Sequence, residues 1–257
     1  MARIRTRLAA ALAAAALALA GCGGSEEPPG GSAAPSGLTV FAAASLTAAF
    51  TELGQQFTTA NGTRVTFNFA GSQALATQIR QGAPADVFAS ADLANMAKVE
   101  DLTGTPRNFA SNLLEIVVEK GNPRGVEGLG DLAAADLKVV LAAPEVPAGK
   151  YAAEVLAKAG VTVRPVSQED NVKAVVTKVA LGEADAGIVY RTDVAAGGGK
   201  VEGVEIPEDQ NVLATYPIAT VKATKAQDQA QAFVDLVLSA EGQRVLEQHG
   251  FLPPPTT

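Results

Sequence analysis

Short apolar runs alternate along the chain with segments in which apolar side chains recur every three or four positions. The runs are five or six residues long, and runs of this length between polar or glycine-rich stretches are typical of buried strands. They fall at residues 38–43, 64–69, 86–90, 113–118, 137–141, 186–190 and 217–221. We therefore predict a strand at each of these seven positions.

The segments between the runs predict amphipathic helices. One carries Leu46, Ala49, Phe50, Leu53 and Phe57 at helical spacing, and another carries Val172, Val175, Val176 and Val179. Alternating strands and helices indicate an α/β protein with largely parallel sheets. About 220 residues follow residue 37, which is enough for one large unit or for two lobes of ordinary size.

The N-terminal residues have the layout of a secretory signal. Arg3, Arg5 and Arg7 precede an uninterrupted run of 13 alanines and leucines at residues 8–20, and this order of charge and apolar run is typical of exported proteins. A membrane-spanning helix needs about 20 apolar residues. Export therefore explains the run better than the alternative, a permanent transmembrane anchor.

The only cysteine of the chain, Cys22, directly follows this signal. Residues 19–22 read Leu-Ala-Gly-Cys and resemble the bacterial lipobox, in which the chain is cut before a lipidated cysteine. We expect residues 1–21 to be removed and Cys22 to carry the lipid. The alternative is an unmodified thiol, because a single cysteine cannot form a disulfide within the chain.

Residues 22–37 predict a flexible tether, and the charge of the mature chain excludes nucleic acid as a partner. The tether is rich in Gly, Pro and Ser and offers little to bury. Removal of residues 1–21 leaves 17 of the 20 basic side chains against all 27 acidic ones, a net charge of −10. Trp is absent and no basic cluster occurs, so neither phosphate binding nor base stacking is favoured.

The residues that most enzymes and metal sites need are scarce. His249 is the only histidine, so a Ser-His-Asp site would have to use it, and no strained G-x-S-x-G turn precedes it. We expect His249 to be a solvated residue in the last helical turn. Zinc needs several His or Cys ligands, and Tyr151, Tyr190 and Tyr216 are too few and too separate for a ferric site. We predict no catalytic activity, no bound metal cation and no cofactor.

Four predicted strand-to-helix junctions consist of small residues with free backbone amides. They lie at residues 42–45, 70–72, 147–149 and 169–172, and Ser45 stands where an N-cap hydroxyl belongs. Taken singly, each junction is an ordinary helix start. Together, unpaired N–H groups and helix dipoles that converge on one cleft would hold an anion.

Five phrases, in order along the chain, resemble the molybdate-binding proteins of ABC transporters. They read FAAASLTAAF, FAGSQALATQIRQGAPADVFASAD, PEVPAGKYA, QEDNV and GIVY, and they span nearly the whole mature chain. The resemblance implies a two-lobed periplasmic-binding-protein fold of type II, with the ligand cleft between the lobes. Lobe 1 would comprise residues 38–116 and 216–257, and lobe 2 would comprise residues 117–215, with crossings near Val117 and Thr215.

The resemblance also implies the ligand residues, which are hydroxyls and amides without lysine, arginine or metal. Matched by motif, Ser45 and Ser72 would bind the oxyanion through hydroxyl and amide, Ala148 and Val172 through their amides, and Tyr190 through its phenol. None of these groups titrates near neutral pH. Binding is therefore expected to change little with pH in that range.

The function implied is that of a monomeric solute-binding lipoprotein on the outer face of the cytoplasmic membrane. It would capture molybdate or tungstate and deliver the oxyanion to an ABC permease. Three alternatives remain at this stage. One is a binding protein for another tetrahedral anion such as sulfate or phosphate. The others are a lipid-anchored esterase or transferase with Ser45 or Ser72 as nucleophile, which would lack an activating base, and a purely structural surface lipoprotein.

Overall fold

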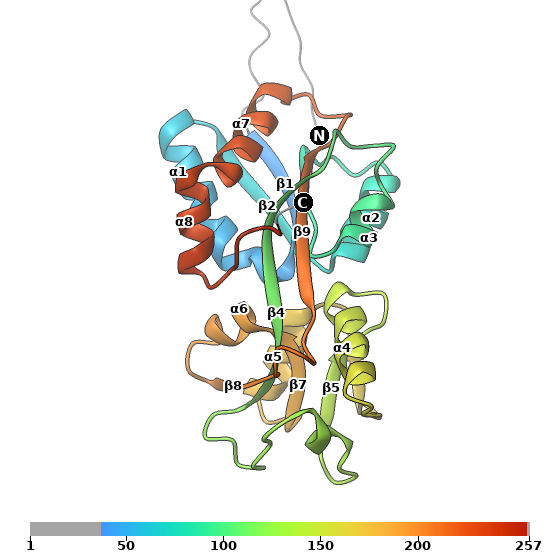
Figure 1. Ribbon diagram of the computed structural model, residues 1–257. Helices are drawn as coiled ribbons and strands as arrows, with labels where there is room; N and C mark the ends of the chain where they lie inside the picture. Colours follow the sequence, from blue (N-terminus) through green and yellow to red (C-terminus); the bar gives the residue numbers. More distant parts are fainter. Residues whose placement is uncertain (1–36, 256–257) are drawn as a thin grey trace, which may run out of the picture. The chain divides into compact units, whose positions relative to one another are not determined.

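In the described part of the chain, nine strands form two mixed sheets that share one long strand (Figure 1). The structure, a computed structural model, describes residues 37–255. The predicted signal segment, Cys22 and all but the last residue of the predicted tether lie outside the described residues. The strands are β1 (Gly37–Ala43), β2 (Arg64–Ala70), β3 (Val87–Ala89), β4 (Arg107–Glu119), β5 (Val139–Ala142), β6 (Ser167–Glu169), β7 (Ala186–Tyr190), β8 (Val201–Glu205) and β9 (Leu213–Thr220).

Helices cover both sheets and supply most of the connections between strands. The α-helices are α1 (Thr47–Asn61), α2 (Ser72–Arg80), α3 (Leu93–Ala97), α4 (Pro147–Lys158), α5 (Val172–Ala180), α6 (Arg191–Ala195), α7 (Gln227–Leu238) and α8 (Ala240–Gln248), and the 3₁₀ turns are η1 (Ala44–Leu46) and η2 (Leu129–Ala133). No helix between residues 37 and 255 combines the length and the apolar character needed to cross a membrane.

Strand β4 joins the two lobes because it changes its pairing partner midway. Its first half, up to Leu113, pairs with β9, which continues the order β2-β1-β3-β9 of the first lobe. From Leu114 onward it pairs with β7 and β8, and β5 and β6 complete the sheet of the second lobe. The predicted crossing points, Val117 and Thr215, fall within β4 and β9. The exact lobe boundaries stay predictions.

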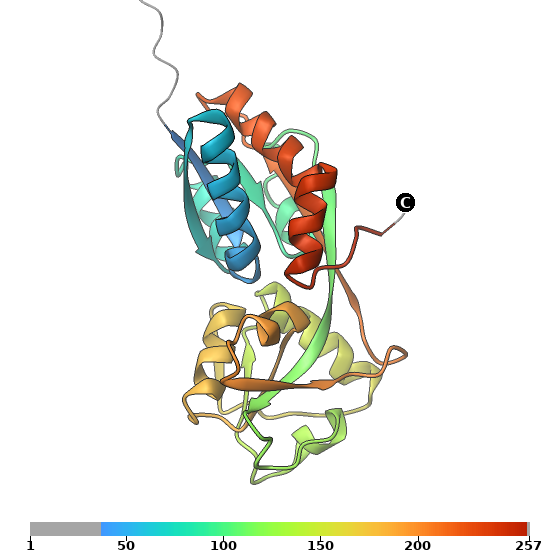
Figure 2. The ribbon, with the colours of Figure 1, turned by 90° about the vertical axis from the view of Figure 1, so that its left-hand side faces the viewer.

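The first lobe has an apolar layer on each face of its sheet. Strand β1 alternates between these layers, since Leu38 and Val40 belong to the cluster under α1, α7 and α8, whereas Phe41 belongs to the cluster under α2 and α3. In the larger cluster the Phe50 and Phe233 rings lie 5.9 Å apart, edge to face. Figure 2 shows α1 beside α7 and α8, so the C-terminal helices return to the lobe in which the fold begins.

The expectation of a solvated His249 in the last helical turn holds only in part. His249 is the C-cap of α8 with 29% of its side chain exposed, and its Nε2 atom lies 2.9 Å from Oε2 of Glu52 on α1. The segment after it is also bonded, because the Ser111 N–H of β4 donates to the Leu252 carbonyl at 2.8 Å. These contacts hold the end of the chain against the first lobe.

Each of the seven predicted runs overlaps a strand, but the expectation of largely parallel sheets was wrong. Four of the eight strand pairs are antiparallel, and all four involve β4 or β9, which run through or beside both lobes. The strands β6 and β8 were not predicted. Their sequences, SQE and VEGVE, have too few apolar residues to form a recognisable run.

Candidate functional site

A small cavity lies where β1 and β2 end and where α2, α4 and α5 begin. Its volume is about 10 Å³, which is room for about one water molecule. None of the described residues that line it is charged. They are Ala43, Ala44, Ser45, Ala70, Gly71, Ser72, Ala91, Val146, Pro147, Ala148, Val172 and Tyr190.

The structure brings all five residues of the predicted site to this cavity. Ser45 and Ser72 come from the first lobe, and the other three come from α4, α5 and β7 of the second. Each of the five is buried, with at most 7% of its surface exposed. Residues more than 140 positions apart in the chain therefore meet at one point between the two lobes.

The second-lobe helices α4 and α5 begin at the cavity. Pro147 is the first residue of α4 and Ala148 the second, while Val172 is the first residue of α5. N–H groups in these positions have no carbonyl one turn earlier in the helix to bond with, and they lie at the positive end of the helix dipole. The N-cap Asn171 bonds the Ala174 N–H at 3.0 Å instead, so the Val172 amide is left for another acceptor.

Ser45 does not cap a helix, and that prediction was wrong. Strand β1 leaves its sheet through the 3₁₀ turn η1, so α1 begins only at Thr47, and no side chain caps it. The Ser45 hydroxyl instead lies 3.0 Å from the Tyr216 hydroxyl of β9. The contact with the buried Tyr216 phenol therefore holds the Ser45 side chain in place.

Ser72 is the first residue of α2 and is held by a backbone amide. The Ala91 N–H donates to the Ser72 hydroxyl oxygen at 3.0 Å, and Gly71 precedes the helix in an extended conformation. Because the oxygen already accepts a bond from Ala91, the single Ser72 proton remains for an acceptor in the cavity.

Tyr190 presents a buried phenol that has no hydrogen-bond partner among residues 37–255. Burial, followed by the nearby Tyr216 and Tyr151, raises the pKa of Tyr190 well above its ordinary value. The hydroxyl therefore stays protonated at any physiological pH. A buried donor without an acceptor costs about 1–3 kcal/mol, so Tyr190 favours a ligand that offers an acceptor oxygen.

A hydrogen bond links the first-lobe and second-lobe sides of the cavity, and two glycines allow close packing around it. The Gln73 amide nitrogen on α2 donates to the Asp170 carbonyl, ahead of α5, at 2.9 Å. Gly71 lies directly beneath this contact, where a Cβ atom would collide with the Gln73 amide and the Asp170 carbonyl. Gly149 is confined in the same way by the Ala142 and Ala143 carbonyls. Both glycines are thus required for the close packing around the site.

Asp193 is a buried carboxylate beside the site that the sequence analysis missed. Only 2% of its surface is exposed, and neither oxygen has a partner within the described part of the chain. Burial raises the pKa of Asp193 to about 7, and the nearby Lys173 charge offsets part of this rise. Its charge in turn raises the pKa of Tyr190 and Tyr216. The expectation that binding is insensitive to pH did not include this group.

A signal for Asp193 was present in the sequence. It stands three positions after Tyr190, which ends β7 and precedes α6, and an acid at this position typically reaches back to the amide at the helix start. Its burial could not be read from the local pattern, because it depends on packing of α6 against β4, which is distant in sequence.

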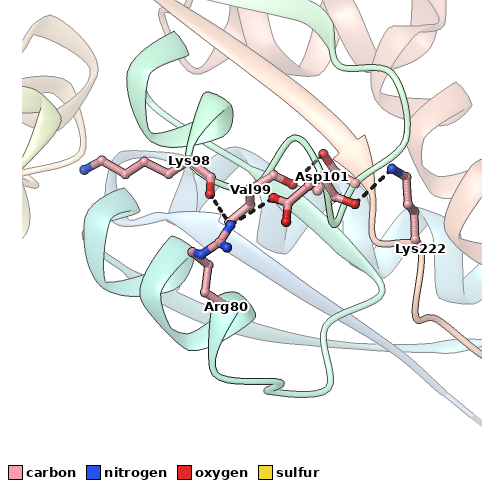
Figure 3. Close-up of polar contacts among 6 residues, drawn as sticks. Arg80, Lys98, Val99, Asp101 and Lys222 are labelled. Atoms are coloured by element: carbon pink, nitrogen blue, oxygen red, sulfur yellow. Dashed lines mark hydrogen bonds and ion pairs between the residues drawn. The ribbon is translucent and has the colours of Figure 1, made fainter.

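A second polar cluster lies on the surface of the first lobe, away from the cavity (Figure 3). The Arg80 guanidinium donates to the Lys98 carbonyl and to the Asp101 carboxylate at 2.8 and 2.9 Å, and the Lys222 ammonium donates to the Asp101 carbonyl at 3.0 Å. These cations are already paired, so the cluster ties α2 to neighbouring loops.

Between residues 37 and 255, no group of three or more His, Cys, Asp or Glu is placed to hold a metal ion.

Comparison with known proteins agrees with this architecture. Residues 38–252 match the family described as bacterial extracellular solute-binding protein, and the chain belongs to this family. The molybdate-binding protein ModA of Mycobacterium tuberculosis is 44% identical over 239 residues, which cover 90% of this chain and 92% of that protein. The family comprises solute-binding transport proteins and is not a family of enzymes.

Two solved structures share the fold. The periplasmic molybdate-binding protein of Azotobacter vinelandii aligns with a TM-score of 0.74 at 21% identity, over 85% of this chain and 100% of that one. The sulfate-binding protein SubI of M. tuberculosis aligns with a TM-score of 0.73 at 20% identity, over 85% and 87%. The two-lobed periplasmic-binding-protein fold predicted from the sequence is confirmed, and the fold alone does not distinguish the two anions.

Asp193 makes the stability of the folded chain depend on pH. Between its ordinary pKa of 3.8 and the folded value of about 7, the folded protein keeps the proton and the unfolded chain releases it. The unfolding free energy therefore falls as pH rises through this window, by up to about 4 kcal/mol. We expect Asp193→Asn to remove this fall, measured by urea unfolding from pH 4 to pH 8.

The exposed Asp209→Asn is the matched control, and it should keep the pH profile of the original protein. The comparison depends on the slope against pH and not on absolute stability, because an amide at position 193 has a cost of its own. A wild-type profile parallel to that of Asp193→Asn would show that the carboxylate ionises normally in the fold.

Proposed function

We propose that this protein captures molybdate, and equally tungstate, outside the cytoplasmic membrane and delivers it to an ABC permease. The observation that carries the proposal is an uncharged cavity lined by hydroxyl-bearing residues and by helix starts from both lobes. The 44% identity to a molybdate-binding protein over nearly the whole chain supports the choice of ligand.

Neutral donors suit a small dianion for a physical reason. Several donors that each carry a partial positive charge distribute the neutralisation over all four oxygens, and hydrogen bonds to a charged oxygen contribute about 1.5–3 kcal/mol each. Ser45, Ser72, Ala148, Val172 and Tyr190 are the proposed ligands. The site requires no cofactor and no metal cation, because the oxyanion enters as a complete ion.

Capture and release follow from the division of these ligands between lobes. An ion that bonds both lobes at once stabilises the closed arrangement by the difference between its affinities for the closed and open states. The protein binds as a monomer in this scheme. The permease then separates the lobes, which removes donors from one side of the ion.

Sulfate is the alternative ligand, and hydrolysis is the alternative function. Sulfate offers the same charge and shape, and SubI shares the fold. Hydrolysis would need a base next to Ser45 or Ser72, and the only histidine lies beside Glu52 at the end of α8. The proposal that the protein binds its ligand without catalysis rests on the distance of this histidine from the two serines.

Removal of single hydroxyls tests the ligand set. We expect Ser45→Ala, Ser72→Ala and Tyr190→Phe each to weaken molybdate binding by about 1.5–3 kcal/mol, because each loses one bond to a charged oxygen. Isothermal titration calorimetry measures the change. Tyr151→Phe is the matched control, since its ring lies 6.5 Å from that of Tyr190 but does not line the cavity, and its affinity should be retained. Full affinity in all three test variants would place the ligand elsewhere.

Selectivity tests the identity of the anion. Molybdate and tungstate are nearly equal in size and larger than sulfate, so donors fixed at helix starts reach the oxygens of the first two and not those of sulfate. Each buried donor left unpaired by sulfate costs about 1–3 kcal/mol. We expect molybdate and tungstate to displace each other at similar concentrations in competition calorimetry, while excess sulfate displaces neither. Equal competition by sulfate would leave an oxyanion-binding protein of a different specificity.

Membrane attachment through Cys22 is the remaining part of the proposal. The support is the Leu-Ala-Gly-Cys sequence after the signal-like run, and two or more acyl chains give stable anchoring at about 0.8 kcal/mol for each buried methylene. Cys22→Ser should therefore move the processed protein from the membrane to the soluble fraction, with unchanged molybdate affinity. A processed variant that still sediments wholly with membranes would point to a different anchor.

A further inference from the structure

Four buried polar side chains, in two hydrogen-bonded pairs, form a chain that leads from the second lobe to the cavity. They are Thr192 on α6, Asn112 on β4, Tyr216 on β9 and Ser45 on η1, and none is more than 7% exposed. The Asn112 amide nitrogen donates to the Thr192 hydroxyl at 2.9 Å, and the Tyr216 and Ser45 hydroxyls lie 3.0 Å apart. Only Ser45, at the end of this chain, lines the cavity.

We infer that Tyr216 is a positioning residue whose hydroxyl donates to Ser45 and thereby directs the single Ser45 proton to the bound oxyanion. The inference rests on the proposed function. A serine hydroxyl has one proton and two acceptor lone pairs. If Ser45 donated to Tyr216, its proton would be unavailable to the ligand, so the direction of this one bond decides what Ser45 offers.

The surroundings of Tyr216 fix that direction. The Asn112 side-chain oxygen already accepts the Leu113 N–H at 3.0 Å, which assigns the amide orientation, and its nitrogen has a second N–H beyond the one given to Thr192. Asn112 also lowers the pKa of Tyr216, which is the effect of an N–H group near the phenol oxygen. An oxyanion offers only acceptors, so it takes the single Ser45 proton, and the Tyr216 proton is then the one left to fill the contact between the two hydroxyls.

The phenol keeps that proton under all ordinary conditions. Burial raises the pKa of Tyr216 far above its usual range, and the bonds to Ser45 and Asn112 offset only part of this effect. A donor bond received by Ser45 also polarises its hydroxyl, which strengthens the bond that Ser45 donates. The Ser72 oxygen likewise accepts a bond, from the Ala91 amide, so both serines would present their protons to the ion.

A double-mutant cycle measured with sodium molybdate tests the inference. Tyr216→Phe should weaken binding about three- to tenfold, since the loss of orientation and polarisation is comparable to one neutral hydrogen bond. In a Ser45→Ala background the same change should have no further effect, because Tyr216 acts only through Ser45. Tyr151→Phe, from the same aromatic cluster, should keep the original affinity.

The sign of the effect excludes the opposite polarity. If Ser45 donates to Tyr216, removing the phenol oxygen frees the serine proton, and Tyr216→Phe would bind molybdate as well or more tightly. Losses that add in the double variant would show that Tyr216 acts through the fold and not through Ser45. Either result overturns the inference.

A ligand-free measurement separates this inference from the proposed function. In the NMR spectrum of the wild-type protein, a slowly exchanging Tyr216 hydroxyl proton should lie close to the Ser45 β protons, and Ser45→Ala should shift it. If molybdate does not bind while this proton is observed, the proposed ligand is wrong and the hydrogen-bond direction stands. If the proton points away from Ser45, the inference fails whatever the ligand is.

Discussion

The site depends on one constraint: a helix cannot pair the N–H groups of its own first turn. In this chain α2, α4 and α5 begin at the same small cavity, and the amides of Ala148 and Val172 stay unpaired there. Exposed to water, such groups are satisfied at no cost; enclosed between two lobes, they need an acceptor. The absence of charged side chains from the cavity follows, because aligned backbone dipoles already supply the positive potential.

Two strands make this arrangement possible by giving the lobes a common framework. Strand β4 pairs with β9 in one half and with β7 in the other, so the lobes are joined through hydrogen-bonded backbone. Tyr216 lies on β9 and Asn112 on β4, and their side chains extend toward Ser45 on one side and Thr192 on the other. These polar groups can be buried at the junction because each forms a hydrogen bond there, which offsets the free energy lost when the group leaves water.

The elements with strong local patterns were predictable, and those defined by distant partners were not. Strand β1 and helix α5 have apolar residues at the periods that their structures require, and the glycines and small residues before α2 and α4 marked their starts. Strand β8 has a polar sequence and forms because β4 offers an unpaired edge. Ser45 looked like an N-cap, but the 3₁₀ turn displaced the start of α1, and its actual partner is 171 positions away. Asp193 could be placed on a helix start but not inside the protein, since burial is a property of the assembled fold.

The course of β1 determines which way the cavity faces. The strand enters its sheet at Gly37 and reaches the cavity at Ala43, and at about 3.3 Å per residue these two points are about 20 Å apart. The carboxyl ends of β1 and β2 and the starts of α4 and α5 all lie at the cavity, whereas the chain enters from the opposite end of the sheet. A protein held by its entry strand is therefore held at the end of β1 that is remote from the cavity.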